Sequence, residues 1–237
     1  MISVTSFLAS ARFIDSDSQN IREFARAAIS HAADEIGRVV ALYRAVRDSV
    51  LYDPYVDLAS PASYRASEIL ALGRGYCVGK ASLLAAVARA AGVPARVGYA
   101  DVRNHMTSPR LYQLIGTDIF RWHSYTDLHV EGHWVKATPA FNASLCERLG
   151  VSVLEFDGRT DSLFQQFDRS GRRHMEYLYH RGTYPDVPFE NIVSDFREHY
   201  PALLSRPGLS GDFQSEAIPG EDAMAADAQF RADKSGG

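Results

Sequence analysis

The chain has 237 residues, which is long enough for one large domain with a hydrophobic core of its own. Hydrophobic residues make up 46% of it and charged residues 23%, and its net charge is −4 with a pI of about 6.1. This composition predicts a globular protein and gives no sign of nucleic acid or a membrane as a partner. No apolar run reaches the roughly 18 residues of a membrane-spanning helix.

The chain contains two cysteines, Cys77 and Cys146. Two cysteines do not make a disulfide framework, and free thiols are typical of a reducing compartment. The first residues, MISVTSFLASARF, lack the basic segment of a signal peptide. We therefore expect a cytoplasmic protein with free thiols, although a pairing of the two cysteines stays open.

Two helices are predicted at the start of the chain. The first lies in a polar stretch over 15–34, after an N-cap such as Asp17 or Ser18. Asp34 is placed to cap the second helix, in which apolar residues recur at helical spacing over 36–50. A Pro-rich, aromatic loop follows. Next comes a short helix that Ser63 could cap and that two glycines end.

Residues 77–91 are the most helical stretch of the chain. Apart from Lys80, Ser82 and Arg89, they are all Cys, Val, Gly, Ala or Leu. A helix that is apolar on nearly all sides is buried in a protein. Gly92 is suited to a left-handed C-cap, so this helix is predicted to end there.

Three strands are predicted after this helix, over 95–102, 120–130 and 133–140. Glu131 and Gly132 separate the last two strands and indicate a two-residue hairpin turn. A short helix is expected between the first two strands.

Later elements are weaker in the sequence. Short strands are predicted around 151–156 and 174–180, and a closing helix over 188–200. Beyond residue 204 the chain is rich in Gly, Ser, Ala and Asp, so 205–237 is expected to be a disordered tail. Helices that precede an antiparallel sheet define an α+β fold, with one domain over 1–204.

Cys77 follows a Gly-x-Gly-Tyr turn at the predicted start of the buried helix. A thiol attacks as the thiolate, which helix N-termini stabilise, and the same free N–H groups could hold an oxyanion. Cysteine is also often a small buried hydrophobe, so position alone leaves both roles open. Cys146 has no glycine turn before it and is predicted to be structural.

The predicted hairpin fixes which side chains share a face of the sheet. With a two-residue turn, Val130 faces His133. Strand alternation then puts His123 on one face with five other side chains, which are Tyr125, Asp127, Lys136, Thr138 and Ala140. A thiol nucleophile needs a base, and His123 is the candidate, unless it is an interior histidine with hydrogen bonds of its own.

Thr138 and Asn142 are the diagonal neighbours of His123, roughly 7–8 Å away at the backbone. Asp127 lies roughly 13 Å along the strand, too far to orient the imidazole. Pro139 cannot donate to a ladder, so the pairing beyond Thr138 is left open.

A metal site is disfavoured. Four residues of suitable type are close in sequence, namely His123, Asp127, His129 and His133, but His133 has the opposite parity. The chain has no H-x-x-x-H on a helix and no paired C-x-x-C. We expect no metal ion and no cofactor.

Several stretches together resemble the transglutaminase-like superfamily of papain-fold thiol enzymes, over about residues 36–145. They are Gly75-Tyr76-Cys77, the run ASLLAAVARAAGVPARVGYA, the hairpin HSYTDLHVEGHWVKATPAFN and the upstream LYRAVRDSVLYDP. The resemblance implies a papain-like fold in which the Cys-bearing helix packs on the antiparallel sheet, and a Cys–His–Asp triad.

In that triad Cys77 falls on the nucleophile and His123 on the base, whereas the position of the Asp falls on Thr138. A threonine can accept a hydrogen bond from the imidazole but cannot stabilise imidazolium as a carboxylate does. Asn142 is an alternative group to orient the imidazole, and Asp101 is a further candidate.

Two functions are therefore weighed. The first is a thiol acyl-transfer enzyme that acts on a peptide or a small amide or ester, with hydrolysis ahead of transfer to an amine. The second is a catalytically impaired relative that serves as a binding or scaffolding module. Tyr76, Arg103 and His105 are candidate substrate contacts, although an ordinary solvated face is the preferred interpretation of the last two. The oligomeric state is not predicted.

Overall fold

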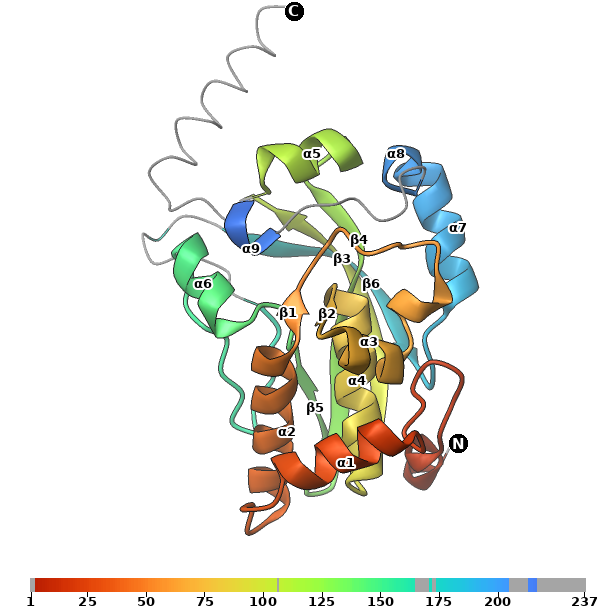
Figure 1. The fold of residues 1–237 in the computed structure, drawn as a ribbon, viewed down its shortest axis with the longest axis vertical. Helices are drawn as coiled ribbons and strands as arrows, with labels where there is room; N and C mark the ends of the chain where they lie inside the picture. Colours follow the sequence, from red (N-terminus) through yellow and green to blue (C-terminus); the bar gives the residue numbers. More distant parts are fainter. Residues whose placement is uncertain (1–2, 106, 165–170, 172–173, 205–212, 217–237) are drawn as a thin grey trace, which may run out of the picture.

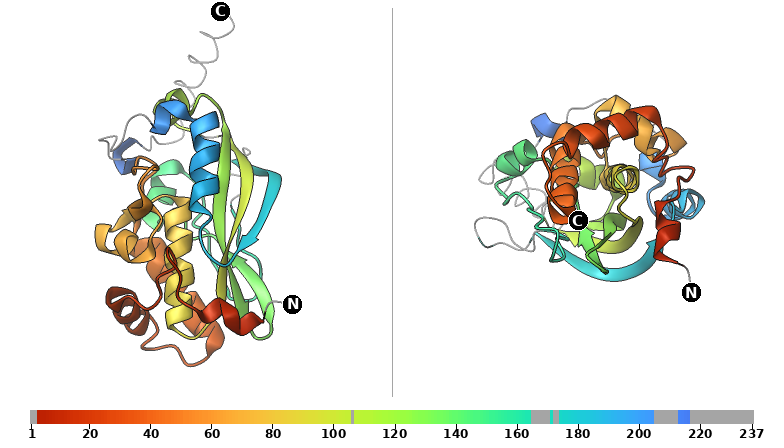
Figure 2. Two further views of the ribbon diagram at one scale, coloured as in Figure 1. Left: turned by 90° about the vertical axis from the view of Figure 1, so that its right-hand side faces the viewer. Right: turned by 90° about the horizontal axis from the view of Figure 1, so that it is seen from below.

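The computed structural model describes residues 3–105, 107–164, 171, 174–204 and 213–216. Helices form one layer and a four-stranded antiparallel sheet forms the other, as Figures 1 and 2 show. The predicted α+β class is confirmed. Among the described residues, no helix is both long and apolar enough to span a membrane.

The first helix is shorter than its predicted range, and the second agrees closely with its range. Helix α1 spans Gln19–Ala28 and ends earlier than expected, and α2 spans Glu35–Ser49. The predicted cap of α2 is confirmed, because the Asp34 carboxylate accepts a 2.6 Å hydrogen bond from the Gly37 N–H group. A short 3-10 helix, Val4–Leu8, precedes α1.

Helix α3 spans Ala66–Leu72, and its predicted cap is wrong. Ser63 lies two residues before the N-cap, at the end of a 3-10 helix over Pro61–Ser63, and its hydroxyl donates to the Asp57 carbonyl instead (2.6 Å). The N-cap position of α3 is taken by Arg65.

Helix α4 spans Cys77–Ala90 and is buried along almost its whole length, as its composition predicts. Its side chains Lys80, Ser82 and Arg89 all bond to backbone carbonyls, which explains how a buried helix tolerates them. The Lys80 ammonium donates to the carbonyls of Arg47 and Val50 at the end of α2, and the Ser82 hydroxyl to that of Phe13.

The sheet has the strand order β5-β4-β3-β6. The strands are β3 (Ala95–Asn104), β4 (Ile119–Val130), β5 (His133–Ala137) and β6 (Met175–Tyr184). A separate two-residue parallel pair, β1 (Leu51–Tyr52) with β2 (Arg74–Gly75), lies just before α4 and was not predicted.

The predicted hairpin register is confirmed. Val130 pairs with His133, and the turn residues Glu131 and Gly132 have φ of 46° and 89°, the left-handed values that a two-residue hairpin turn requires. The ladder ends at Ala137, three residues short of the prediction, and the Thr138 N–H group donates instead to the Ser162 carbonyl (2.9 Å).

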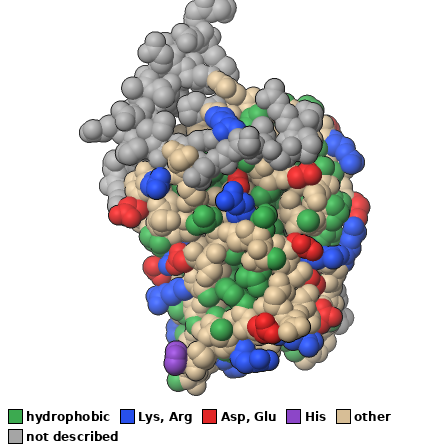
Figure 3. Space-filling model, in the orientation of Figure 1, with side chains coloured by type: hydrophobic (Ala, Val, Ile, Leu, Met, Phe, Trp, Pro, Cys, Tyr) green, Lys and Arg blue, Asp and Glu red, His purple; other side chains and the backbone are tan. Residues whose placement is uncertain are grey.

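Five more helices follow α4 in the described part of the chain, and α7 is the longest of them. They are α5 (Pro109–Ile115), α6 (Ala143–Leu149), α7 (Phe189–His199), α8 (Pro201–Leu204) and α9 (Phe213–Glu216). Residues 151–156 form no strand. The predicted disordered tail lies outside the described residues, except for α9, which packs on the domain (Figure 1). Acidic and basic side chains are interspersed over the coloured surface of Figure 3.

Candidate active site

Cys77 is the first residue of α4, and three backbone N–H groups lie around its sulfur. Burial raises the pKa of the Cys77 thiol to about 11, and the N–H groups of Ser124, Val78 and Cys77 itself oppose that rise. The Ser124 contact places the sulfur against β4, beside the residue that follows His123. The thiol is therefore neutral at rest, in a site that can stabilise negative charge.

The β1–β2 pair sets the direction in which the chain enters α4. Tyr52 pairs with Gly75, two residues before Cys77, and the Asp53 N–H group donates to the Gly75 carbonyl (3.0 Å). A Cβ atom at Gly75 would lie 3.1 Å from a methyl group of Ile69. The close packing at this turn explains why glycine precedes Tyr76 and Cys77.

His123 lies on β4, is 7% exposed, and pairs with Ala100 of β3. Burial, and then the nearby His174, lowers the pKa of His123 to about 4, so its imidazole is neutral at physiological pH. The ring of His174 stacks on Phe141, with ring centres 6.1 Å apart. His174 was not singled out from the sequence, because it lies in a segment without a recognisable motif.

His123 and Thr138 line the same pocket. Its eight lining residues are His123, Thr138, Ala140, Phe141, Leu154, Leu163, Phe164 and Met175. His123, Thr138 and Ala140 therefore line one pocket, although Thr138 and Ala140 lie beyond the last paired residue of β5. Among the described residues, neither His123 Nε2 nor Thr138 Oγ1 has a hydrogen-bond partner.

The two alternative orienting groups have other partners. The Asn142 carboxamide accepts from the Tyr52 N–H group (3.0 Å) and donates to Ser144 and Gln214 (2.8 and 3.1 Å). Asp101 accepts two hydrogen bonds from the Arg181 guanidinium, at 2.5 and 2.9 Å. Neither side chain bonds to His123 in this structure.

A β-bulge lies directly before His123. The pairing of β3 with β4 shifts between Ala100 and Val102, and Trp122 has a φ of 59°, a strained value for a residue with a large side chain. Asp101, at the shift, accepts a 3.1 Å hydrogen bond from the Trp122 N–H group. A bulge changes the direction of the side chains next to it, and here the next side chain is His123, the candidate base.

Two further residues hold the Trp122 indole. Its Nε1–H group donates to Asp195 of α7 (2.9 Å), and the Arg181 guanidinium lies over its rings, 4.5 Å from their centre. The sequence gives no signal for the left-handed backbone at Trp122 or for these two partners.

The candidate substrate contacts are already engaged. The ring of Tyr76 is 5% exposed and packs edge-on against Tyr64, with ring centres 5.5 Å apart. The Arg103 guanidinium pairs with Glu176 and Asp118, at 2.9 and 3.3 Å.

His105 joins the same cluster, since its Nε2 lies 3.8 Å from Glu176. The described part of the chain holds no group of three or more His, Cys, Asp or Glu side chains arranged to bind a metal ion.

The site and fold agree with a family match in the sequence. Residues 22–139, about half of the chain, match the transglutaminase-like superfamily, and the chain belongs to that superfamily over this range. The match contains Cys77, His123 and Thr138. No curated protein matches the chain.

Two solved structures are similar at low identity. The first is a candidate cysteine protease from Cytophaga hutchinsonii, with 19% identity, a TM-score of 0.47, and coverage of 77% of this chain and 47% of that one. The second is a candidate protease from Parabacteroides distasonis, with 18% identity, a TM-score of 0.39, and coverage of 57% of this chain and 26% of that one. The chain thus spans less than half the length of either protein.

Proposed function

We propose that the chain is a thiol-dependent acyl-transfer enzyme that acts on an amide or ester bond. The observation that carries this proposal is the set of N–H groups around the Cys77 sulfur at the start of α4, one of them from the residue after His123. A neutral thiol and a neutral histidine suit a reaction in which the proton moves as the sulfur attacks.

In the proposed reaction Cys77 Sγ attacks the substrate carbonyl carbon, and His123 takes the thiol proton. Backbone N–H groups at the start of α4 stabilise the oxyanion. The C–N or C–O bond breaks, and His123 returns the proton to the leaving group, which leaves a thioester on Cys77. Water then attacks the thioester with His123 as base, and the acid departs as the thiol is restored.

The two side chains are not hydrogen-bonded to each other in the described contacts. Catalytic hydrogen bonds are often open in free enzymes and close when substrate binds. Peptides and small amides or esters are the proposed substrates, and hydrolysis is preferred to transfer because water needs no second binding site. A cytoplasmic location stays a prediction, with which two free cysteines agree.

A direct test uses p-nitrophenyl acetate as an activated ester and locates the acetyl group by peptide mass spectrometry. We expect acetylation of Cys77, none in Cys77→Ala, and a rate lower by roughly 100-fold or more in His123→Ala. Cys146→Ala, which changes a buried thiol in α6, is the matched control. In this variant Cys77 should be acetylated at the rate of the unchanged chain. An acetyl group on Cys146, or on neither cysteine, would refute the mechanism.

Two observations favour the alternative, a binding or scaffolding module. Threonine stands at the triad Asp position, and His123 Nε2 has no partner among the described residues. A chain that remains folded but is not acetylated at Cys77 would support this alternative.

A further inference from the structure

Helix α9 docks on the domain through one aromatic side chain. The ring of Phe213 is buried at 8% exposure and packs edge-on against Tyr52 and Tyr55, with ring centres 5.6 and 5.8 Å apart. In Figure 1, α9 lies next to α6 and above β1, the strand that contains Tyr52. The two tyrosines therefore form an aromatic receptor for Phe213.

The next residue is bound through polar groups. The Gln214 carboxamide accepts from Asn142 Nδ2 (3.1 Å) and donates to the Tyr52 carbonyl (2.9 Å). The Gln214 main-chain carbonyl accepts from Arg148 of α6 (2.9 Å). Both the side chain and the backbone of the segment are thus recognised.

The receptor is held in place by contacts that do not involve α9. The Tyr52 N–H group donates to the Asn142 carboxamide, and the Tyr52 ring packs on Phe141, with centres 4.8 Å apart. The Tyr55 N–H group donates to Asp53 (2.9 Å), and the Arg110 guanidinium lies 4.7 Å from the centre of the Tyr55 ring. Such a preformed surface binds a peptide without a large rearrangement.

Helix α9 itself is four residues long. Isolated helices need about 12–15 residues to be even marginally stable in water, so α9 is held by its side-chain contacts with the receptor. The contacts of Phe213 and Gln214 with the receptor therefore resemble those of a bound peptide.

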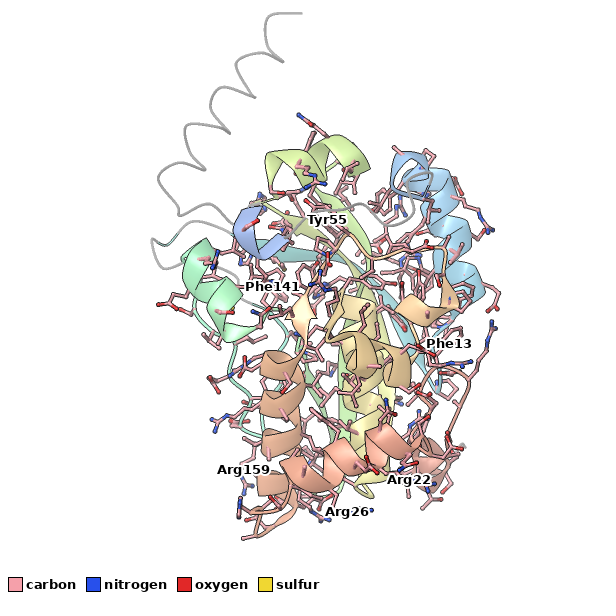
Figure 4. The ribbon with its side chains drawn as sticks, viewed as in Figure 1. Phe13, Arg22, Arg26, Tyr55, Phe141 and Arg159 are labelled. Carbon is pink, nitrogen blue, oxygen red and sulfur yellow. The ribbon has the colours of Figure 1, made fainter. Side chains whose placement is uncertain are left out.

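The receptor adjoins the candidate active site. Tyr52 pairs with Gly75, two residues before Cys77, and Phe141 lines the pocket of His123. Figure 4 shows Tyr55 and Phe141 close to β1, near the end of α4 that carries Cys77.

We propose that Tyr52, Tyr55, Asn142 and Arg148 form a peptide-binding subsite beside Cys77, which the chain's own Phe213–Gln214 fills. The ligand class is a peptide with a large aromatic side chain followed by a residue with a carboxamide. This proposal deepens the proposed function, since such peptides would be substrates, and the attached segment competes with them.

The test uses a fluorescent synthetic peptide, LSGDFQSEA, which reproduces residues 209–217. Phe213→Ala in the 237-residue chain should vacate the receptor. Fluorescence anisotropy should then show that this variant binds the peptide more tightly than the unchanged chain does, by roughly tenfold or more. The reason is that an attached segment competes at a millimolar effective concentration. Phe230→Ala is the matched control, and it should bind the peptide as weakly as the unchanged chain does.

A peptide with alanine in place of its phenylalanine should not bind the Phe213→Ala chain. The proposal is overturned if the Phe213→Ala chain and the unchanged chain bind the original peptide equally, or if neither binds it. Circular dichroism shows whether each variant is folded. Should Phe213→Ala not fold, Gln214→Ala, which removes only the carboxamide, takes its place with the same expected result.

Two further measurements separate this subsite from the proposed reaction. Saturating peptide should slow the alkylation of Cys77 by iodoacetamide in Phe213→Ala to the rate of the unchanged chain, and a bound peptide that gives no protection would overturn the placement beside Cys77. Cys77→Ala combined with Phe213→Ala should bind the peptide as tightly as Phe213→Ala alone. If Cys77 is never acetylated but the peptide still binds, the proposed function fails and the subsite stands.

Discussion

The imidazole of His123 lies in a pocket lined mainly by apolar side chains, and this makes its protonation costly. Its pKa is about 4 in the folded chain, against an ordinary value of 6.5. The unfolded chain therefore takes up the proton first as the pH falls. The free energy of unfolding should decrease between pH 6.5 and 4, by up to about 3 kcal/mol from this group.

Urea unfolding at pH 7 and pH 4 measures this effect in the unchanged chain and in His123→Gln. The loss of stability between the two pH values should be smaller in His123→Gln, because that chain has no imidazole to protonate there. His31→Gln, at an exposed position, should behave like the unchanged chain. Equal losses in the unchanged chain and His123→Gln would show that His123 is not buried in its neutral form.

Thr138 gives a second prediction at the residue scale. Thr138→Asp would put a carboxylate beside His123, whose Nε2 has no partner among the described residues. A carboxylate stabilises imidazolium, so acetylation of Cys77 should become faster, by roughly tenfold or more, and the pKa of His123 should rise. Thr138→Asn, which has the same size without the charge, should give no such gain; a gain of equal size would contradict this account.

Single residues were predictable from the sequence where local geometry decides. The place of Cys77 at the start of α4 follows from a glycine turn before an apolar helix. Thr138 lines the pocket of His123, as expected from their nearness across the hairpin. The catalytic roles of these residues stay predictions. The role of Asn142 was not predictable. Two of its three partners, Tyr52 and Gln214, are 90 and 72 residues away in the chain, and no local pattern records such contacts.

At the scale of elements, the bulge before His123 is the feature most closely connected to function. Asp101 bonds to the Trp122 N–H group and to Arg181, and so supports the strained backbone. Asp101→Asn removes the ion pair with Arg181 and should loosen the placement of His123. Acetylation of Cys77 should slow by roughly tenfold, since a displacement of about 1 Å can cost 100-fold, and its pH–rate profile should shift.

Asp127→Asn is the matched control for that prediction. Asp127 faces Arg96 across the same two strands and pairs with it at 2.7 Å, at a distance from the bulge. Asp127→Asn should lower the melting temperature as Asp101→Asn does. It should leave the rate of Cys77 acetylation and the pH profile of that rate unchanged. If both variants slow acetylation alike, the role of Asp101 is general to the sheet.

The elements show why some features could be predicted and others could not. The hairpin was predictable because its turn residues and its apolar alternation are adjacent in sequence. The bulge was not, because it depends on Arg181 and Asp195, which belong to β6 and α7. The β1–β2 pair was also missed, since two-residue strands carry no periodicity.

At the scale of the whole molecule, buried cations of α4 join distant parts of the chain. The Arg89 guanidinium donates to the carbonyls of Ala9, Ala95 and Pro185, at 2.5–3.0 Å. These carbonyls belong to the N-terminal segment, to the start of β3 and to the loop after β6. Composition predicts that α4 is buried, but only the folded chain shows that Arg89 hydrogen-bonds to three separate segments.

Arg89→Met should therefore destabilise the whole domain. Methionine keeps the length and apolar character of the stem, but it leaves three carbonyls without their donor, each at a cost of roughly 1–3 kcal/mol when buried. We expect the free energy of unfolding in urea to fall by about 3 kcal/mol or more, with a single cooperative transition retained. Arg44→Met removes an exposed arginine that pairs with Glu155 at 3.3 Å and should cost less than about 1 kcal/mol. Equal losses from the two variants would mean that Arg89 contributes no more than a surface ion pair.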